Sequence, residues 1–217
     1  MSLRRTALLL AGASMIALAP VALADEAASS SDGGTWQFRA RVISVVPDED
    51  ADISTIGGTV DIDTSYVPEF DITYYFTKNW AAELILAVTP HTITHEPTGI
   101  ELGDVWLLPP TLTLQYHFAP DSDSFRPYVG AGVNYTIFFG DDAASGISFG
   151  DFDSSFGIAL QAGFDIPIND RGWVFNVDVK KIWLNTEVDV TLPGPLTVNA
   201  DVDINPWVIG VGIGYKY

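Results

Sequence analysis

Three histidines, His91, His95 and His117, are the side chains of this 217-residue chain best suited to acid–base chemistry or metal binding. His91 and His95 lie in an extended stretch, where residues four positions apart are roughly 13 Å from each other, so we do not expect them to share a metal. His117 is expected to be a hydrogen-bonded structural histidine. The chain has no cysteine, and no serine is expected beside a histidine and a carboxylate. The sequence therefore indicates no catalytic residue, cofactor site or metal site, and a lipase or protease is the alternative that an enzyme assay would test.

An acidic stretch, Asp48 to Asp52, is the other feature with metal-binding character. Its sixth position holds Ile53, where an EF-hand calcium loop needs glycine. The glutamate ligand that ends such a loop is also missing. We expect a solvated acidic loop that binds divalent ions loosely alongside lipopolysaccharide. The whole chain carries a formal net charge of −18, which argues against nucleic acid as a partner because a phosphate backbone requires clustered lysine and arginine.

The secondary structure of the chain is most clearly indicated by its C-terminal segment, Trp207 to Tyr217. Large apolar side chains occupy every second position there, and mainly glycine or polar residues stand between them. Because successive strand residues point to opposite faces, this segment has one large apolar face and one small-residue face. Seven further segments alternate in the same way. The expected strands cover residues 36–46, 69–76, 80–88, 111–118, 128–138, 156–165, 173–180 and 207–217.

The pattern predicts an all-β protein, an eight-stranded antiparallel transmembrane up-and-down β-barrel with short periplasmic turns and long extracellular loops. The connections alternate long and short, as they do in barrels of the bacterial outer membrane. Aromatic residues gather near both ends of the expected strands, where their rings would meet the lipid headgroups. The alternative is a soluble lipocalin-like barrel. Its polarity would be inverted, however, with the apolar residues inside and the charged residues outside.

The N-terminal segment is predicted to be a secretory signal peptide over residues 1–24. It begins with the basic pair Arg4-Arg5, continues with a short apolar run and ends at Ala22-Leu23-Ala24, a small-residue cleavage site. Residues 25–35, rich in alanine, serine and glycine, are expected to form a flexible leader, and residues 36–217 the barrel.

Several motifs in order carry a resemblance to a known family: Phe70–Thr77, Leu108–Phe118, Arg126–Tyr135 and Asn205-Pro206-Trp207. From Trp36 to its C-terminus the chain resembles the outer membrane protein W (OmpW) family. The resemblance implies a narrow hydrophobic channel for carrying small apolar molecules across the outer membrane. It also implies that the barrel-assembly machinery reads the C-terminal strand that ends in Tyr217.

The inward-facing residues of the expected strands differ in polarity between the two ends of the barrel. Eight strands enclose little more than their own side chains, so an open aqueous pore is not expected. Near the periplasmic end the inward residues are charged with both signs, and they are expected to pair into an ionic floor of Arg39, Arg41, Asp71, Glu83, Asp178 and Lys216. Nearer the loops they are apolar, and the expected channel lining is Ile43, Val45, Ile85, Leu107, Phe138, Ile182, Leu184 and Val208.

A channel with a closed floor leaves an apolar solute one dry exit, sideways into the membrane. Pro90, Pro109 and Pro110 lie near the loop end, and proline cannot donate to a strand ladder, so these residues are the expected lateral exit. The expected partners are outer-membrane lipid, lipopolysaccharide and a small hydrophobic solute. Two alternatives stay open. The apolar residues can be a packed core with prolines that merely end strands, and the barrel can be structural or a surface receptor without transport.

Overall fold

The computed structural model describes residues 34–53, 59–95, 98–150, 152–192 and 196–217, and all structural statements below concern these ranges. The predicted signal peptide and most of the predicted leader lie outside them. All regular elements within them are β-strands. None of the described residues forms a helix long and apolar enough to cross a membrane.

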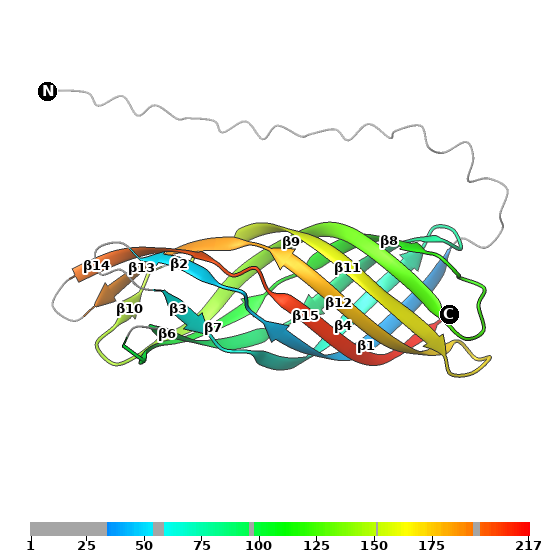
Figure 1. Ribbon diagram of the computed structural model, residues 1–217, viewed down its shortest axis with the longest axis horizontal. Helices are drawn as coiled ribbons and strands as arrows, with labels where there is room; N and C mark the ends of the chain where they lie inside the picture. Colours follow the sequence, from blue (N-terminus) through cyan, green and yellow to red (C-terminus); the bar gives the residue numbers. More distant parts are fainter. Residues whose placement is uncertain (1–33, 54–58, 96–97, 151, 193–195) are drawn as a thin grey trace, which may run out of the picture. The chain divides into compact units, whose positions relative to one another are not determined.

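Eight strands close into an antiparallel barrel, which confirms the predicted fold class (Figure 1). The first and last strands, β1 and β15, pair with each other from Gln37 opposite Lys216 to Val46 opposite Trp207, and β9 pairs with β11, so that the ring of strands is complete. The order around the barrel is β1-β4-β5-β8-β9-β11-β12-β15. The barrel strands are β1 (Thr35–Val46), β4 (Ser65–Tyr75), β5 (Trp80–Ala87), β8 (Thr111–His117), β9 (Arg126–Ala143), β11 (Ser155–Pro167), β12 (Trp173–Trp183) and β15 (Trp207–Lys216).

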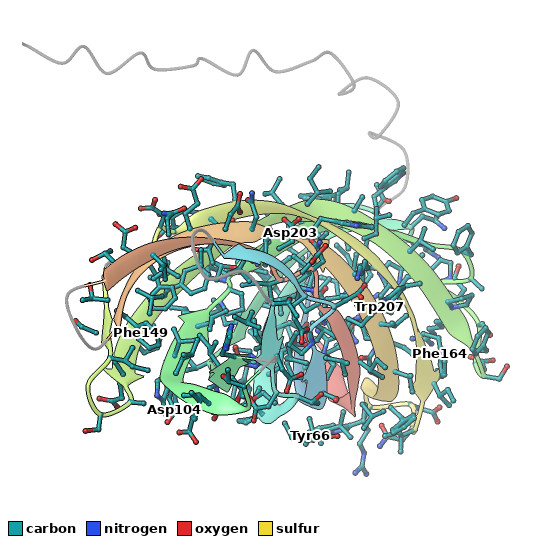
Figure 2. All side chains as sticks on the ribbon, turned by 60° about the vertical axis from the view of Figure 1, so that its left-hand side comes forward. Tyr66, Asp104, Phe149, Phe164, Asp203 and Trp207 are labelled. Carbon is teal, nitrogen blue, oxygen red and sulfur yellow. The ribbon has the colours of Figure 1, made fainter. Side chains whose placement is uncertain are left out.

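The outer face of the barrel is apolar, as an environment of lipid requires. In β4 every second residue is buried, and the residues between them are exposed except for the half-buried Tyr74; the exposed positions include Phe70 and Ile72. Aromatic residues border this belt. Tyr66 and Trp207 are exposed near the end where the long connections begin, and Figure 2 shows Tyr66 pointing away from the ribbon. Trp36 and Trp173 are exposed near the other end.

The long connections were predicted to be loops, and this was wrong for most of their length, since they form strands that prolong the barrel. We call this part the extension; Figure 1 shows it at the end opposite the C-terminus. Here the polarity of the alternation is inverted: in β13, Val188 and Val190 are buried, whereas Glu187 and Asp189 are exposed. The reason is that the outside is now water instead of lipid. The extension strands are β2 (Asp50–Ile53), β3 (Val60–Ile62), β6 (Thr89–His95), β7 (Ile100–Leu108), β10 (Ser148–Phe149), β13 (Asn185–Leu192) and β14 (Leu196–Asp203).

The extension consists of two sheets. One is formed by β3, β6 and β7 along the upper part of β9, and it continues the barrel sheet. The other is a separate sheet in the order β10-β13-β14-β2. Among the described strands, no ladder joins β9 to β10 or β2 to β3. The two sheets therefore face each other across two seams that are closed by side chains.

Candidate functional site

A cluster of buried charges fills the barrel below the extension, and this is the ionic floor. Arg39 and Arg41 lie two residues apart on the inner face of β1, and both side chains are fully buried. They share two carboxylates: Arg39 lies 3.1 Å from Asp71 and 2.9 Å from Glu83, and Arg41 lies 2.8 Å and 3.3 Å from the same two groups. Removing charges from water is unfavourable by several kcal/mol per ion, so each must be met by more than one partner, as here.

Four further charges join this cluster. Lys180 of β12 lies 2.8 Å from Asp178 and 3.1 Å from Glu69, and Asp165 of β11 lies 3.2 Å from Arg39. The sequence had placed Asp165 and Asp178 at the level of the floor but had not assigned Lys180 or Glu69 to it. Their inward position in the alternation was the available signal. The assembled cluster has three cations, Arg39, Arg41 and Lys180, and five carboxylates, Glu69, Asp71, Glu83, Asp165 and Asp178.

Neutral donors compensate for this excess of carboxylates. Gln161 donates from Nε2 to Glu83 at 2.7 Å and to Asp178 at 2.8 Å. The hydroxyl of Tyr128 donates to Asp178 at 2.7 Å, and Gln115 Nε2 donates to Glu83 at 2.8 Å. A buried polar network in which nearly every member is satisfied is rigid, and these almost fully buried side chains fill the lumen at this level.

Lys216, the sixth predicted floor residue, lies apart from the ion pairs. Its Nζ is 3.6 Å from the centroid of the Tyr75 ring, a cation–π contact, and among the described residues it forms no ion pair. His117 lies at the same end of the floor. Its ring packs 5.0 Å from those of Tyr75 and Tyr128, and its Nε2 is 3.1 Å from Gln115 Oε1. These contacts suit the structural role expected of this histidine.

Above the floor lies a cavity of about 690 Å³, enclosed by the top of the barrel and by the extension. Most of its lining is apolar. The predicted channel residues lie on its wall with one exception: Ile85 is buried but does not line the cavity. The predicted residues that do line it are Ile43, Val45, Leu107, Phe138, Ile182, Leu184 and Val208.

Much of the cavity wall comes from residues of the long connections, which were predicted to be loops, and in one place these pack against the predicted lining residue Phe138. One part is an aromatic cluster at the seam between β9 and β10, where Phe138 stacks on Phe152 at 5.6 Å and Phe149 meets Phe152 edge-on at 5.5 Å. In Figure 2, Phe149 is labelled at the extension end and Phe164 lies toward the other end. The other missed part is an aliphatic wall on β13 and β14, made of Val188, Val190, Val198, Ala200 and Val202.

The strand ladder is interrupted beside the cavity, and we call this interruption the break. The ladder between β5 and β8 ends where Ile85 faces Thr111, and the ladder between β6 and β7 begins where Thr89 faces Leu107. Residues 86–88 and 108–110 therefore do not pair with each other. Two of the predicted exit prolines, Pro109 and Pro110, are in the break, whereas Pro90 lies outside it, opposite Trp106 in the β6–β7 ladder. Pro109 also lines the cavity.

The two remaining histidines line the cavity from β6. His91 Nδ1 is 2.9 Å from the backbone oxygen of Asp63, and His95 Nδ1 is 2.8 Å from Thr98 Oγ1. Burial lowers the pKa of His91, partly offset by the carbonyl and carboxylate of Asp63. Among the described residues, no cluster of three or more histidine or acidic side chains has the geometry of a metal site.

Known proteins with the same features are similar to this chain over nearly its whole length. A profile described as the OmpW family matches residues 32–217. Outer membrane protein W of Vibrio cholerae is 36% identical over 197 residues, which are 85% of this chain and 89% of that protein. The dibenzothiophene metabolism operon protein PahQ of Pseudomonas aeruginosa is 33% identical over 190 residues, 84% of this chain and 88% of that protein. The crystal structure of the outer membrane protein OprG from Pseudomonas aeruginosa matches with a TM-score of 0.78 and 32% identity, over 85% of this chain and 96% of OprG.

Proposed function

This chain belongs to the OmpW family of outer-membrane barrels, and from that premise we propose that its cavity takes up small apolar molecules and releases them sideways into the membrane. The observation that carries the proposal is an apolar cavity standing directly on a closed ionic floor. A pore for polar solutes would need a continuous wet path, and the floor blocks one.

The floor also supports a sideways direction of release. A solute that continued toward the periplasm would have to separate buried ion pairs, and breaking one such pair is unfavourable by roughly 3–5 kcal/mol. An apolar molecule offers no replacement for those contacts. Movement into the hydrocarbon of the bilayer, in contrast, keeps an apolar molecule away from water throughout.

The break supports a sideways route. It lies beside the cavity, and it lacks the strand ladder that seals the wall elsewhere in the described barrel. Leu86 and Val88, on the outer face of this segment, are exposed at the level of the lipid. An apolar solute at Pro109, which lines the cavity, would therefore leave between two chain segments that no backbone ladder joins.

A relative gives the proposal a chemical direction. PahQ is named for an operon of dibenzothiophene metabolism, and dibenzothiophene is an apolar aromatic molecule. The aromatic cluster of Phe138, Phe149 and Phe152 would provide stacking partners for solutes of this kind.

Uptake of a labelled apolar solute into liposomes that contain the purified protein tests the proposal. Phe138→Asp and Leu107→Asp each place a charge on the cavity wall and are expected to abolish protein-dependent uptake. Asn185→Asp adds the same charge on the exposed side of β13 and is the matched control. Unchanged uptake in the two cavity variants would show that the solute does not pass through the cavity. Absence of protein-dependent uptake with the wild-type protein would favour a structural barrel or a receptor without transport.

A further inference from the structure

The cavity is not equally apolar on all sides. The wall made by β13 and β14 presents mainly valine and alanine, whereas β6 turns polar side chains inward along part of the opposite wall. Polar groups on an apolar wall are unfavourable unless something satisfies their hydrogen bonds. The inward residues of β6 are Thr89, His91, Ile93 and His95.

His91 presents an unused acceptor. Its Nδ1 faces the carbonyl oxygen of Asp63 at 2.9 Å, and because a carbonyl can only accept, Nδ1 must carry the proton. Burial lowers the pKa of the ring, which favours its neutral form, so Nε2 is a bare acceptor. Nε2 has no hydrogen-bond partner within the described part of the chain.

Thr89, two residues before His91 on the same face, has a second unused group. Its side chain is almost fully buried, it lines the cavity, and its hydroxyl has no partner among the described residues. The other two buried threonines of the cavity differ: Thr186 donates to the backbone oxygen of Asp153 at 3.0 Å, and Thr136 donates to Asn134 at 2.7 Å. Thr89 and His91 are thus adjacent polar groups that the fold leaves open.

We infer that Thr89 and His91 form a recognition site for a single hydroxyl group, so that the cavity prefers phenols and alcohols over the corresponding hydrocarbons. This inference rests on the proposed function and names its substrate class. The solute hydroxyl would donate to His91 Nε2 and accept from the Thr89 hydroxyl, and the apolar body would lie against the aliphatic wall. Their Cα atoms are about 7 Å apart on the same face of the strand. One hydroxyl would serve both groups by lying between Nε2 and Oγ1, about 2.8 Å from each.

The site is placed at the inner edge of the proposed exit. Thr89 is the first residue of the β6 ladder beyond the break. A hydroxylated solute held there would move its apolar body through the break first and release its polar end last. It would then arrive in the bilayer with the hydroxyl near the headgroups, where an amphipathic molecule is most stable.

Binding of naphthalene and 2-naphthol, which differ by one hydroxyl, tests the inference. Both are fluorescent, and their affinities for the protein in liposomes can be measured after subtracting their partition into protein-free liposomes. The wild-type protein is expected to prefer 2-naphthol by about tenfold, the range of one to two net hydrogen bonds. Thr89→Val removes one hydroxyl at constant shape and is expected to lower this preference about threefold. His91→Phe is expected to lower it further.

Thr186→Val is the matched control, because it removes a cavity hydroxyl that the protein already uses. It is expected to leave the preference unchanged. Equal binding of the two solutes by the wild-type protein, or an undiminished preference in Thr89→Val, would overturn the inference and leave the proposed function intact. Binding of neither solute would overturn both. The Thr89→Val result decides the matter even if His91→Phe does not fold.

Discussion

Asn134 donates a hydrogen bond from Nδ2 to the backbone oxygen of Pro109, 3.2 Å away, and so ties β9 to the segment in which two prolines have removed backbone donors. The same Nδ2 lies 2.9 Å from Thr111 Oγ1, and the Asn134 side-chain oxygen accepts from Thr136 at 2.7 Å. One fully buried amide therefore holds the edge of the break in place.

Replacing Asn134 with alanine is expected to destabilise the barrel by about 1–3 kcal/mol, because the buried Thr136 hydroxyl loses its acceptor and Pro109 loses one of its two donors. Urea unfolding in lipid vesicles measures the change. Asn185→Ala, on the exposed side of β13, should alter stability by less than about 0.5 kcal/mol. If the two variants are equally stable, Asn134 does not hold the break.

Arg41→Met tests the ionic floor. The substitution keeps most of the side-chain volume but leaves Glu69, Asp71 and Glu83 short of a cation, and it is expected to destabilise the protein by about 3–5 kcal/mol. Arg171→Met removes an equal charge from an exposed turn and is expected to have almost no effect. The same unfolding assay measures both. Equal stabilities would mean that the floor is not a stabilising ion network.

Gly212 and Gly210 on β15 give a contrast in packing. A methyl group on Gly212 would collide with the backbone oxygen of Ala40 on the neighbouring strand, whereas one on Gly210 would meet the movable side chain of Ile43 at 3.0 Å. Gly212→Ala is therefore expected to impair barrel closure, and Gly210→Ala to be tolerated. The folded fraction, read from the shift in gel mobility between heated and unheated samples, measures this. Efficient folding of Gly212→Ala would contradict the steric argument.

We expect the stability of the extension to depend on pH because of His91. Burial lowers its folded-state pKa below the ordinary value of 6.5, while Asp63 and Glu49 act in the opposite direction. The neutral ring therefore contributes its full stability above about pH 6.5, and this contribution is lost as the pH falls through the folded-state pKa. Amide hydrogen exchange in β6, corrected for the intrinsic rate, is expected to be faster near about pH 5 than near about pH 8. His91→Phe should remove this difference, and a persisting difference would assign it to other groups.

The barrel strands could be predicted because lipid imposes a strict alternation. Ile209, Val211 and Ile213 must face outward, and a shift by one residue would turn every one of them into the lumen. The extension escaped prediction because its alternation has the opposite polarity. Val188 and Val190 are the inward residues there, and the surrounding acidic and threonine residues favoured a loop.

For the site, the sequence predicted which side chains face the lumen but not which of them contact each other. Alternation placed Arg39, Arg41 and Asp71 in the lumen, yet it could not show that Lys180 would reach across to Glu69, which is 111 residues away in the chain. That contact depends on the register of strands on opposite sides of the barrel. For the same reason, the sequence did not separate Lys216, which lies against the Tyr75 ring, from the ion pairs above it.

The two seams of the extension have a consequence for how the mouth of the barrel can widen. Parting the two sheets breaks no ladder hydrogen bond among the described strands, although the bond from Ile62 N to Glu49 Oε1, 3.1 Å long, crosses one seam. What parting chiefly loses is apolar contact, such as that between Phe138 and Phe152. An apolar guest between the sheets would restore that contact from its own surface. If the proposed uptake occurs, the width of the mouth would follow the size of the guest, whose apolar surface would replace the contacts that the two sheets lose.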